Sequence, residues 1–287
     1  MKWEVISKNR VKSQKELIDI LLKNRGIVNK KDRESFFEPK IPEKLTLKEL
    51  GISESEVKKA IVRIKKAIKT QEKVFVYGDY DADGVCATAI MWETLFSIGL
   101  NVLPYIPERF SEGYGLNVES IKKLKEENVD LGLIITVDHG IVADKKIDTA
   151  KELGIDVVIT DHHQPGKAKP KPFALVHTTK ISGSGVSYIF ANEIKKKIDV
   201  VKKLDRDSLE LAAIGTIADQ LPLIGPNRSI AKYGLDALNK TKRVGLITLF
   251  ENAAVKIGNI GTYEVGFMIA PRINAMGRLG HAIESLR

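Results

Sequence analysis

The stretch that most constrains the fold of this chain is VFVYGDYDADGVCATA, residues 74–89. It opens with VFVY, which is β-branched or aromatic and uncharged and therefore predicts a strand buried on both faces. Three carboxylates follow at alternate positions, Asp79, Asp81 and Asp83, and small apolar residues then open a predicted helix. Carboxylates crowded between a buried strand and a helix repel one another and are costly to desolvate. The sequence therefore predicts a divalent cation at this point.

Two other interpretations of the stretch are weaker. The spacing D-x-D-x-D-G also begins a calcium-binding EF-hand loop, but that loop needs a Glu at its twelfth position and a helix before it. Counted from Asp79, the twelfth residue is Ile90, and a predicted strand precedes the motif. A solvated acidic turn at a helix N-terminus would explain one or two of the aspartates but not three.

Apolar runs alternate with helical patterns through the middle of the chain. This alternation predicts an α/β fold in which helices flank both faces of a mostly parallel sheet. Ligands of such sheets bind outside the carboxyl ends of the strands. The predicted strands are residues 74–79, 102–106, 131–138, 157–161 and 173–176, and the predicted helices are residues 85–98, 118–127, 143–153, 186–194 and 208–218. SGSG, residues 182–185, is expected to form a flexible turn.

Polar side chains stand at the ends of two further predicted strands. One ends in VDHG, residues 137–140, and the next in TDHH, residues 160–163. Because the carboxyl ends of parallel strands meet at one edge, we expect these side chains to converge with the first three aspartates. Taken alone, His162 and His163 could be ordinary loop histidines. Asp219 ends the last predicted helix, where a carboxylate opposes the helix dipole unless it binds a cation.

The bulk properties restrict the class of protein. A chain of 287 residues with 43% hydrophobic content can bury a core as one large or two smaller domains. No apolar run approaches the ~20 residues of a membrane span, and the charged start MKWEVISKNR lacks the apolar core of a signal peptide. We therefore expect a soluble cytoplasmic protein without membrane association.

Cysteine usage and charge restrict the ligands. Cys86 is the only cysteine, which excludes intramolecular disulfides and thiolate-rich zinc sites, so a metal would be held by oxygen and imidazole. The formal net charge is +9, which suits a polyanionic substrate drawn to an acidic, cation-binding pocket. Lysine-rich, solvated helix faces would produce the same excess of charge.

The flanking regions are predicted to be helical. We divide the chain into an N-terminal extension at residues 1–70, a catalytic α/β domain at 71–225 and a helical segment at 226–287. The last segment closes with APRINAMGRLGHA, in which Arg272, Asn274 and Arg278 are expected on a glycine-containing loop. Arginines there could grip phosphates in a bidentate manner, or they could simply tie helices together.

Four motifs in order, GDYDADG, VDHG, DHH and GTIADQLPL, resemble those of the DHH phosphoesterase superfamily. The segments ERFSEGYGL, PNRSIAKYGLDAL and PRINAMGRLG further resemble the RecJ family of single-strand-specific 5′ to 3′ DNA exonucleases. The resemblance spans residues 74–281. It implies two Mn²⁺ or Mg²⁺ ions, single-stranded DNA as the partner, and hydrolysis that releases 5′ mononucleotides.

The resemblance also implies roles for individual residues. His163 would lie beside the scissile phosphate as an acid or charge stabiliser, and Asp161 would orient an imidazole. Arg109 and Arg278, together with Arg272 and Asn274, would bind the substrate. The implied metal ligands are Asp79, Asp81, Asp83, Asp138, His162 and Asp219, with Asp138 as the candidate bridging ligand and the direct ligands among the first three left open.

The sequence departs from the family pattern in one respect, and two alternatives remain. The RecJ pattern includes a second domain with a Gly-Gly-His motif, which this sequence lacks, so we expect a missing or separate second catalytic domain, weaker DNA affinity and lost processivity. A DHH hydrolase of short oligonucleotides, cyclic dinucleotides or pyrophosphate is one alternative, but such relatives usually carry a His in the first motif. A non-catalytic scaffold of the same fold is the other, although eroded ligands would mark it.

Overall fold

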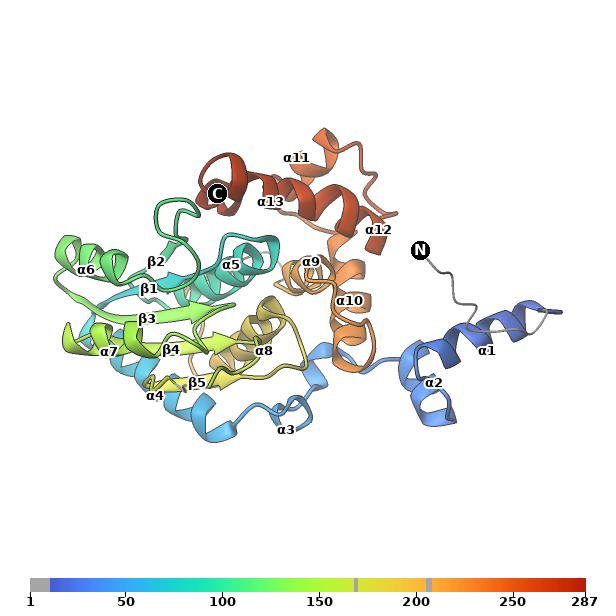
Figure 1. Cartoon of the computed structure of the whole chain (residues 1–287), viewed down its shortest axis with the longest axis horizontal. Helices are drawn as coiled ribbons and strands as arrows, with labels where there is room; N and C mark the ends of the chain where they lie inside the picture. Colours follow the sequence, from blue (N-terminus) through green and yellow to red (C-terminus); the bar gives the residue numbers. More distant parts are fainter. Residues whose placement is uncertain (1–10, 168–169, 205–207) are drawn as a thin grey trace.

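A computed structural model describes residues 11–167, 170–204 and 208–287 of the chain. Its strands form one five-stranded parallel sheet in the order β2-β1-β3-β4-β5 (Figure 1). The strands are β1 (Lys73–Tyr77), β2 (Val102–Tyr105), β3 (Leu131–Val137), β4 (Asp156–Asp161) and β5 (Ala174–His177). The predicted α/β class and parallel sheet are thus confirmed. The charged first ten residues, on which the expectation of no signal peptide depends, lie outside the described residues.

The sheet is buried on both faces because its strands are almost continuously apolar. In β1, Val74 and Val76 belong to one hydrophobic core, whereas Phe75 and Tyr77 belong to a second core on the opposite face. This alternation is what the two-residue period of a strand produces. Ile135 of the central strand β3 pairs with β1 on one side and with β4 on the other.

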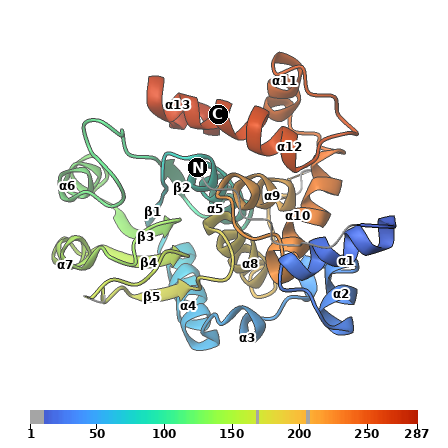
Figure 2. The ribbon, with the colours of Figure 1, turned by 45° about the vertical axis from the view of Figure 1, so that its right-hand side comes forward.

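Helices cover both faces of the sheet (Figure 2). The larger core lies between the sheet and a helical layer that includes α9, which packs on α5 and α8. The smaller core lies beneath α6 and α7. The helices of the larger core are α4 (Glu54–Thr70), α5 (Ala82–Ser97), α8 (Gly183–Lys195) and α9 (Leu209–Ala218), and those of the smaller core are α6 (Val118–Glu127) and α7 (Asp144–Glu152).

Two helices begin earlier than expected, and both corrections concern the carboxyl edge of the sheet. Residues 183–185 form the first turn of α8 rather than a flexible turn, because the Ser182 hydroxyl caps the helix by accepting from the Gly185 amide at 3.1 Å. Likewise α5 begins at Ala82, with Asp81 as its N-cap. Asp83 therefore lies inside the first turn of a helix and not in the loop before it.

The C-terminal part is helical, as predicted, but it contains no loop at residues 271–279. These residues belong to α13, which has a proline in its first turn, where the missing amide costs nothing. Gly277 lets α13 approach the first motif, since a Cβ there would lie 2.6 Å from the Tyr80 carbonyl oxygen. The elements of this part are α10 (Gly225–Leu238), α11 (Val244–Asn252), α12 (Thr262–Glu264), the π-helical turn η2 (Val265–Ile269), α13 (Ala270–Leu279) and α14 (Ile283–Leu286).

The first two helices of the N-terminal extension, α1 and α2, project from one side of the molecule (Figure 1). The attachment of the extension to α10 includes Arg228, whose guanidinium lies 3.9 Å from the centre of the Phe36 ring and donates to the Phe36 carbonyl at 2.6 Å. The elements of the extension before α4 are α1 (Gln14–Asn24), α2 (Lys30–Phe37), η1 (Pro42–Lys44) and α3 (Leu47–Leu50). None of the described helices has the length and apolar character needed to cross a membrane.

A buried ion-pair network closes the amino edge of the sheet, opposite the strand ends that carry the motifs. Arg63 of α4, only 3% exposed, binds both carboxylate oxygens of Glu72 at 2.9 and 2.7 Å and Asp156 at 2.6 Å. It also donates to the Gly132 carbonyl at 2.8 Å. One side chain thus joins α4 to the starts of β1, β3 and β4.

Candidate metal centre

The acidic and imidazole side chains of the four motifs meet at the carboxyl edge of the sheet. The His162 Nε2 atom, directly after β4, lies 3.1 Å from an oxygen of Asp138, which directly follows β3. The same nitrogen lies 3.7 Å from Asp219 at the end of α9 and 4.0 Å from Asp83 in α5. Side chains separated by up to 136 positions in the sequence, from Asp83 to Asp219, are therefore within reach of one small cation.

Three overlapping groups have ligand atoms within 4.8 Å of one another. Asp138 and His162 each belong to two of these groups, so the groups form one continuous cluster, which we call the acidic cluster. The groups are Asp79, Asp81 and Asp138; Asp83, His162 and Asp219; and Asp138, His162 and His163. All six sequence-predicted metal ligands are members, as is His163.

Asp83 is held by the N-terminus of another helix. Its carboxylate accepts from the Gly183 amide at 2.7 Å and from the Ser184 amide at 3.0 Å, the first two amides of α8. These amides have no partner within their own helix, and the helix dipole favours a negative charge at this end. The early start of α8 therefore fixes a buried carboxylate in the acidic cluster.

Asp138 is the most constrained member of the acidic cluster. It is 2% exposed and has φ of 65°, in the left-handed region that few residues other than glycine adopt. Its Oδ1 atom is buried and accepts no hydrogen bond from the described residues, although the His162 nitrogen lies close. A buried carboxylate oxygen without a partner costs free energy unless a cation binds it.

Four carboxyl groups of the acidic cluster have a raised pKa and so bind protons more tightly than isolated aspartates. Burial, followed by the charge of Asp81, raises the pKa of Asp79 to about 7. Burial and the charge of Asp83 raise the pKa of Asp219 to about 7 as well, and they raise the pKa of Asp138 well above its ordinary value. Desolvation lowers the pKa of His162. The chain thus gathers anionic groups whose charge it does not neutralise, which is the donor set of a hard divalent cation.

Asp161 and His163 form a separate pair at the rim. Burial opposes the charge of Asp161, but hydrogen bonds from the His163 ring at 2.8 Å and from three amides outweigh it and lower the pKa of Asp161 to about 2. The same hydrogen bond raises the pKa of His163. Asp161 is therefore a fixed anion that orients the imidazole, so that the His163 Nε2 atom faces outward.

Two residues near the acidic cluster have roles that the sequence patterns did not assign. His139 is buried with its pKa lowered to about 4 by desolvation, and it hydrogen-bonds the Tyr77 carbonyl at 2.9 Å, which makes it a structural histidine. The Tyr114 hydroxyl lies 3.4 Å from the His163 Nε2 atom. Tyr114 lies between two glycines with positive φ, Gly113 and Gly115. The sequence GYG is the signal from which this turn could have been predicted, because glycine adopts positive φ readily.

The four predicted substrate-binding residues divide into two pairs. Arg109 lies 5.0 Å from the centre of the Tyr80 ring, beside the first motif, and exposed Arg278 follows Gly277, which contacts the same motif. The Asn274 side chain instead accepts from the Ala82 amide at 2.7 Å and so caps α5. Arg272 donates to the Met268 carbonyl at 2.7 Å.

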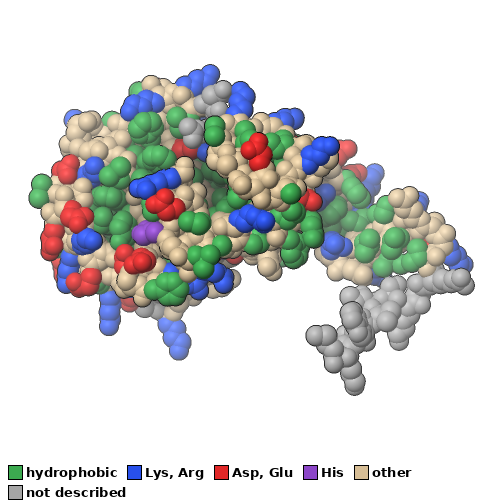
Figure 3. All heavy atoms as spheres, turned by 90° about the horizontal axis from the view of Figure 1, so that it is seen from above, with side chains coloured by type: hydrophobic (Ala, Val, Ile, Leu, Met, Phe, Trp, Pro, Cys, Tyr) green, Lys and Arg blue, Asp and Glu red, His purple; other side chains and the backbone are tan. Residues whose placement is uncertain are grey.

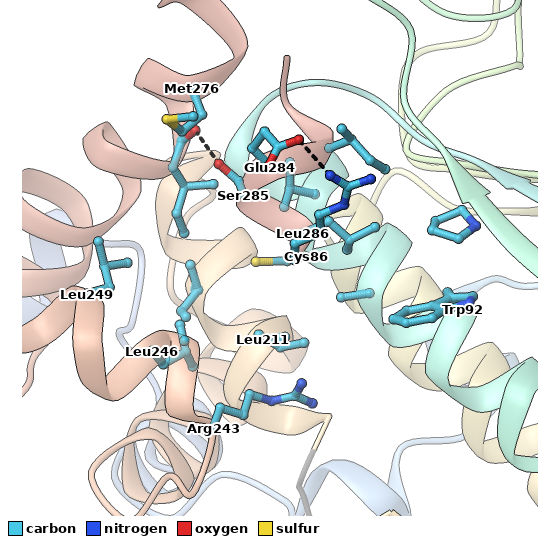
Figure 4. Close-up of a pocket in the computed structure, with 18 of the residues that line it drawn as sticks. Cys86, Trp92, Leu211, Arg243, Leu246, Leu249, Met276, Glu284, Ser285 and Leu286 are labelled. Atoms are coloured by element: carbon cyan, nitrogen blue, oxygen red, sulfur yellow. Dashed lines mark hydrogen bonds and ion pairs between the residues drawn. The ribbon is translucent and has the colours of Figure 1, made fainter. Parts of the chain in front are cut away.

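Arg272 also lines a cavity that does not include the acidic cluster. The cavity has a volume of about 1090 Å³ and lies between α5, α11, α13 and α14 (Figure 4). Cys86 and Trp92 line it from α5, Leu246 and Leu249 line it from α11, and Arg243 lies at its edge, where it is bonded to Glu93. The substrate-binding role expected for Arg272 from the sequence stays a prediction.

On one face of the molecule, the basic side chains do not gather into a patch. Lysine and arginine side chains are scattered over the face shown in Figure 3, with carboxylates between them, rather than gathered into one patch. On this face, the positive charge therefore gives a general attraction for polyanions and marks no binding track.

Comparison with known proteins places these observations in a family. Residues 73–216 match the model of the DHH family, N-terminal domain. The chain is 45% identical over 235 residues to the single-stranded-DNA-specific exonuclease RecJ of Bacillus subtilis, a match that covers 79% of this chain and 29% of the relative. It is 38% identical over 239 residues to RecJ of Thermus thermophilus, covering 80% of this chain and 34% of the relative. The chain thus spans about a third of the length of these relatives.

Solved structures give the same result. A crystal structure of exonuclease RecJ bound to manganese superposes with a TM-score of 0.71 and 37% identity, covering 81% of this chain and 60% of that one. RecJ from Thermus thermophilus in complex with Mn²⁺ superposes with a TM-score of 0.73 and 33% identity, covering 93% of this chain and 37% of that one. The same protein in complex with Mg²⁺ gives a TM-score of 0.63.

Proposed function

This chain belongs to the DHH family, and from that membership and its acidic cluster we propose that it is a phosphodiesterase that degrades single-stranded DNA from the 5′ end, with two Mn²⁺ or Mg²⁺ ions as cofactors. The relatives named RecJ support the substrate class, and the manganese- and magnesium-bound RecJ structures support the metals. The product would be 5′ mononucleotides, and the place of action would be the cytoplasm, where DNA is available.

A single observation carries the proposal. The six predicted ligands come from four separate segments, yet their donor atoms form one cluster at the carboxyl edge of the sheet. Carboxylates in a structural role would be paired with cationic side chains, as Glu72 and Asp156 are with Arg63. Instead, Asp138 keeps a buried oxygen without a hydrogen bond in the described part of the chain.

The donor set fits two hard ions. Five carboxylates and His162 offer oxygen and imidazole ligands, which suit Mn²⁺ or Mg²⁺, and Cys86 is absent from the cluster. Asp138 belongs both to the group with Asp79 and Asp81 and to a group with His162, so it is our candidate for the ligand that both ions share. When bound, such a pair supplies a nucleophilic water and neutralises charge on the phosphate and the leaving oxygen.

The Asp161–His163 pair would act on the phosphate itself. Asp161 keeps a proton on the His163 Nδ1 atom and leaves the Nε2 atom facing the rim. Because the hydrogen bond to Asp161, together with the Asp161 charge, raises the pKa of His163, the imidazolium form persists closer to neutral pH. It can then donate a hydrogen bond to a phosphate oxygen or protonate the leaving oxygen. The 46% exposure of its side chain makes His163 accessible to a substrate.

Arg109 and Arg278 would grip the substrate. Both are exposed and adjoin the first motif, Arg109 through the Tyr80 ring and Arg278 through Gly277. Guanidinium groups there can bind phosphates next to the scissile bond. Asn274 would contribute indirectly, because it caps the helix that carries Asp83.

Digestion of end-labelled DNA with Mn²⁺ tests this function. We expect labelled mononucleotides from the 5′ end of single-stranded DNA, slow attack on duplex DNA and no activity in EDTA. Asp138→Ala should lower the rate at least about 100-fold, since it removes a shared ligand. Asp148→Ala is the matched control, because Asp148 lies exposed on α7, away from the cluster.

The outcomes separate the proposal from its alternatives. Undiminished hydrolysis by Asp138→Ala would contradict the assignment of the cluster. Faster cleavage of a dinucleotide than of long single-stranded DNA would favour a hydrolase of short oligonucleotides. Binding of Mn²⁺ without turnover of any of these substrates would favour a non-catalytic scaffold.

A further inference from the structure

The connection between β2 and α6, residues 106–117, reaches the acidic cluster without being part of it. Its ends are buried at Ile106 and Leu116, while its middle is open to solvent, with Phe110 79% exposed. The middle forms turns rather than helix or strand. We call residues 106–117 the β2–α6 loop.

Two side chains of the β2–α6 loop contact the catalytic residues and the first motif. The Tyr114 hydroxyl lies 3.4 Å from the His163 Nε2 atom and 3.5 Å from the Asp138 carbonyl oxygen. The Arg109 guanidinium lies 5.0 Å from the centre of the Tyr80 ring, and the centre of the Tyr114 ring lies 6.2 Å from it. The position of the loop therefore decides where Arg109 and Tyr114 stand relative to a substrate phosphate.

One carboxylate of the loop fastens it to both neighbouring elements. Glu112 accepts from the Tyr105 hydroxyl at the end of β2 at 2.5 Å and from the Ser120 hydroxyl in α6 at 2.6 Å, both at the same oxygen. Its backbone carbonyl accepts from the side chain of Asn117, the N-cap of α6, at 2.8 Å. By contrast, the nearby carboxylate of Glu108 is exposed and bonds Ser111 within the loop.

We infer that Glu112 is a positioning residue for substrate binding, which acts by holding the β2–α6 loop so that Arg109 and Tyr114 face the acidic cluster. The inference rests on the proposed function, since Arg109 is taken to bind substrate phosphate. The printed partners of the Glu112 carboxylate among the described residues are Tyr105, Ser120 and the Glu108 amide, so Glu112 acts through the loop and does not touch the reacting atoms.

The charge of Glu112 is essential to this role. Two hydroxyl groups donate to one oxygen, and hydrogen bonds from hydroxyls to a carboxylate are shorter and stronger than those to a neutral acceptor. Burial and the hydrogen bond to Glu112 raise the pKa of Tyr105, so its hydroxyl stays protonated as a donor. A glutamine would keep the shape but offer a weaker acceptor, and its NH₂ group would have to turn away from both hydroxyls.

The test compares Glu112→Gln with Glu108→Gln, which makes the same chemical change in the same loop. Two quantities are measured in each protein: hydrogen exchange across residues 106–117, and the Kd for a fluorescent single-stranded oligonucleotide with Ca²⁺ in place of Mn²⁺, so that no turnover is required. For Glu112→Gln we expect faster exchange confined to the loop and a Kd raised about tenfold. For Glu108→Gln we expect both quantities to equal those of the wild type.

A double-mutant cycle with Arg109→Ala separates positioning from a merely structural role. If Glu112 acts through Arg109, then Glu112→Gln adds little to the loss already caused by Arg109→Ala. Tyr105→Phe, which removes one donor, should give a smaller loss of the same kind. An unchanged Kd in Glu112→Gln, or losses that add fully in the double variant, would overturn the inference. Hydrolysis with Mn²⁺ is measured separately. If the wild-type protein bound the oligonucleotide but did not cleave it, the proposed function would be refuted, whereas the positioning role of Glu112 would not be affected.

Discussion

Three structural features of Asp138 suit it to bind a metal ion. The end of β3 places it at the edge of the sheet, its left-handed backbone turns the carboxylate toward His162, and burial removes the water that would otherwise solvate it. Each of these features costs free energy in a protein without a bound ion. A shared divalent cation would offset all of them at once.

The titration of the acidic cluster predicts a pH-dependent metal affinity. The folded-state pKa values of Asp79 and Asp219 are raised to about 7, above the ordinary value of 3.8. Because the folded protein binds these protons more tightly than the unfolded chain, their binding stabilises the metal-free fold. This stabilisation is complete below about pH 4 and is lost as the pH rises through 7. Mn²⁺ must displace these protons at pH 6 but not at pH 8. The increase in Tm on replacing EDTA with Mn²⁺ should therefore be larger at pH 8 than at pH 6.

Asp219→Asn provides the control for this measurement. It removes one predicted metal ligand, so the Mn²⁺-induced increase in Tm should be smaller. It also removes one of the two protons that compete with the metal, so the increase should depend less on pH. Equal increases at both pH values in the wild-type protein would show that these carboxyl groups do not bind the metal.

Residue types at the site were predictable from the sequence, whereas their partners were not. The aspartates and histidines follow apolar strands, and strand ends meet in space, so Asp138, His162 and their neighbours could be assigned to one edge. The contact between Tyr114 and His163 depends on the path of an irregular loop, which no periodicity encodes. The same is true of Asn274, whose cap on α5 joins segments 192 positions apart.

Among the elements, α8 matters most for the site because its N-terminus faces the acidic cluster. Gly183, its first residue, donates to Asp83, and a Cβ there would lie 2.1 Å from the Asp138 Oδ1 atom. Gly183→Ala should therefore displace Asp138, lower the Mn²⁺ affinity about tenfold or more and destabilise the fold by about 1–3 kcal/mol. Calorimetric titration with Mn²⁺ and urea denaturation measure the two effects.

Gly245→Ala is the matched change in a helix away from the site. Gly245 lies in α11, is exposed, and has open space where a Cβ would stand. We expect unchanged Mn²⁺ affinity and a gain of up to about 1 kcal/mol in stability, because alanine loses less backbone entropy on folding. Wild-type Mn²⁺ affinity in Gly183→Ala would contradict the close packing of α8 on Asp138.

At the opposite edge of the sheet, the Arg63 network is expected to affect stability alone. Arg63→Ala leaves Glu72 and Asp156 without their guanidinium partner, and both carboxylates are only partly exposed, at 15% and 38%. The free energy of unfolding should fall by about 2–3 kcal/mol, measured by urea denaturation, while the rate of DNA hydrolysis below the transition stays at the wild-type value. Lys122→Ala, which breaks an exposed pair with Glu119, should cost no more than about 0.5 kcal/mol. A loss of hydrolysis in folded Arg63→Ala protein would contradict this separation of the two edges.

The sequence predicted the elements well where a single period dominates and less well where glycine and proline are frequent. The buried strands were recognised because their apolar runs are short and uninterrupted. The first turn of α8 and the whole of α13 were taken for loops, because their glycines and proline suggest turns. In the structure, Gly183 and Gly277 instead allow close approach of backbones to Asp138 and Tyr80, a reason that only tertiary contacts reveal.

At the scale of the whole molecule, the α/β fold explains why the four motifs cluster. A parallel sheet directs all its carboxyl ends to one edge, and α9 brings Asp219 to that edge from outside the sheet. The division of the chain at residues 70 and 225 remains a prediction. The chain spans about a third of the length of the relatives named RecJ, so its affinity for substrate and its processivity are predictions to be measured on this chain.

Anomalous diffraction from crystals of the protein grown with Mn²⁺ tests the metal centre most directly. We predict two manganese peaks per chain at the carboxyl edge of the sheet, both within bonding distance of Asp138, with His162 and Asp219 among the ligands of the ions. In crystals of Asp138→Ala, at least one of the peaks should be lost. A fully occupied manganese site elsewhere, or no peak at the acidic cluster in the wild-type protein, would contradict the account.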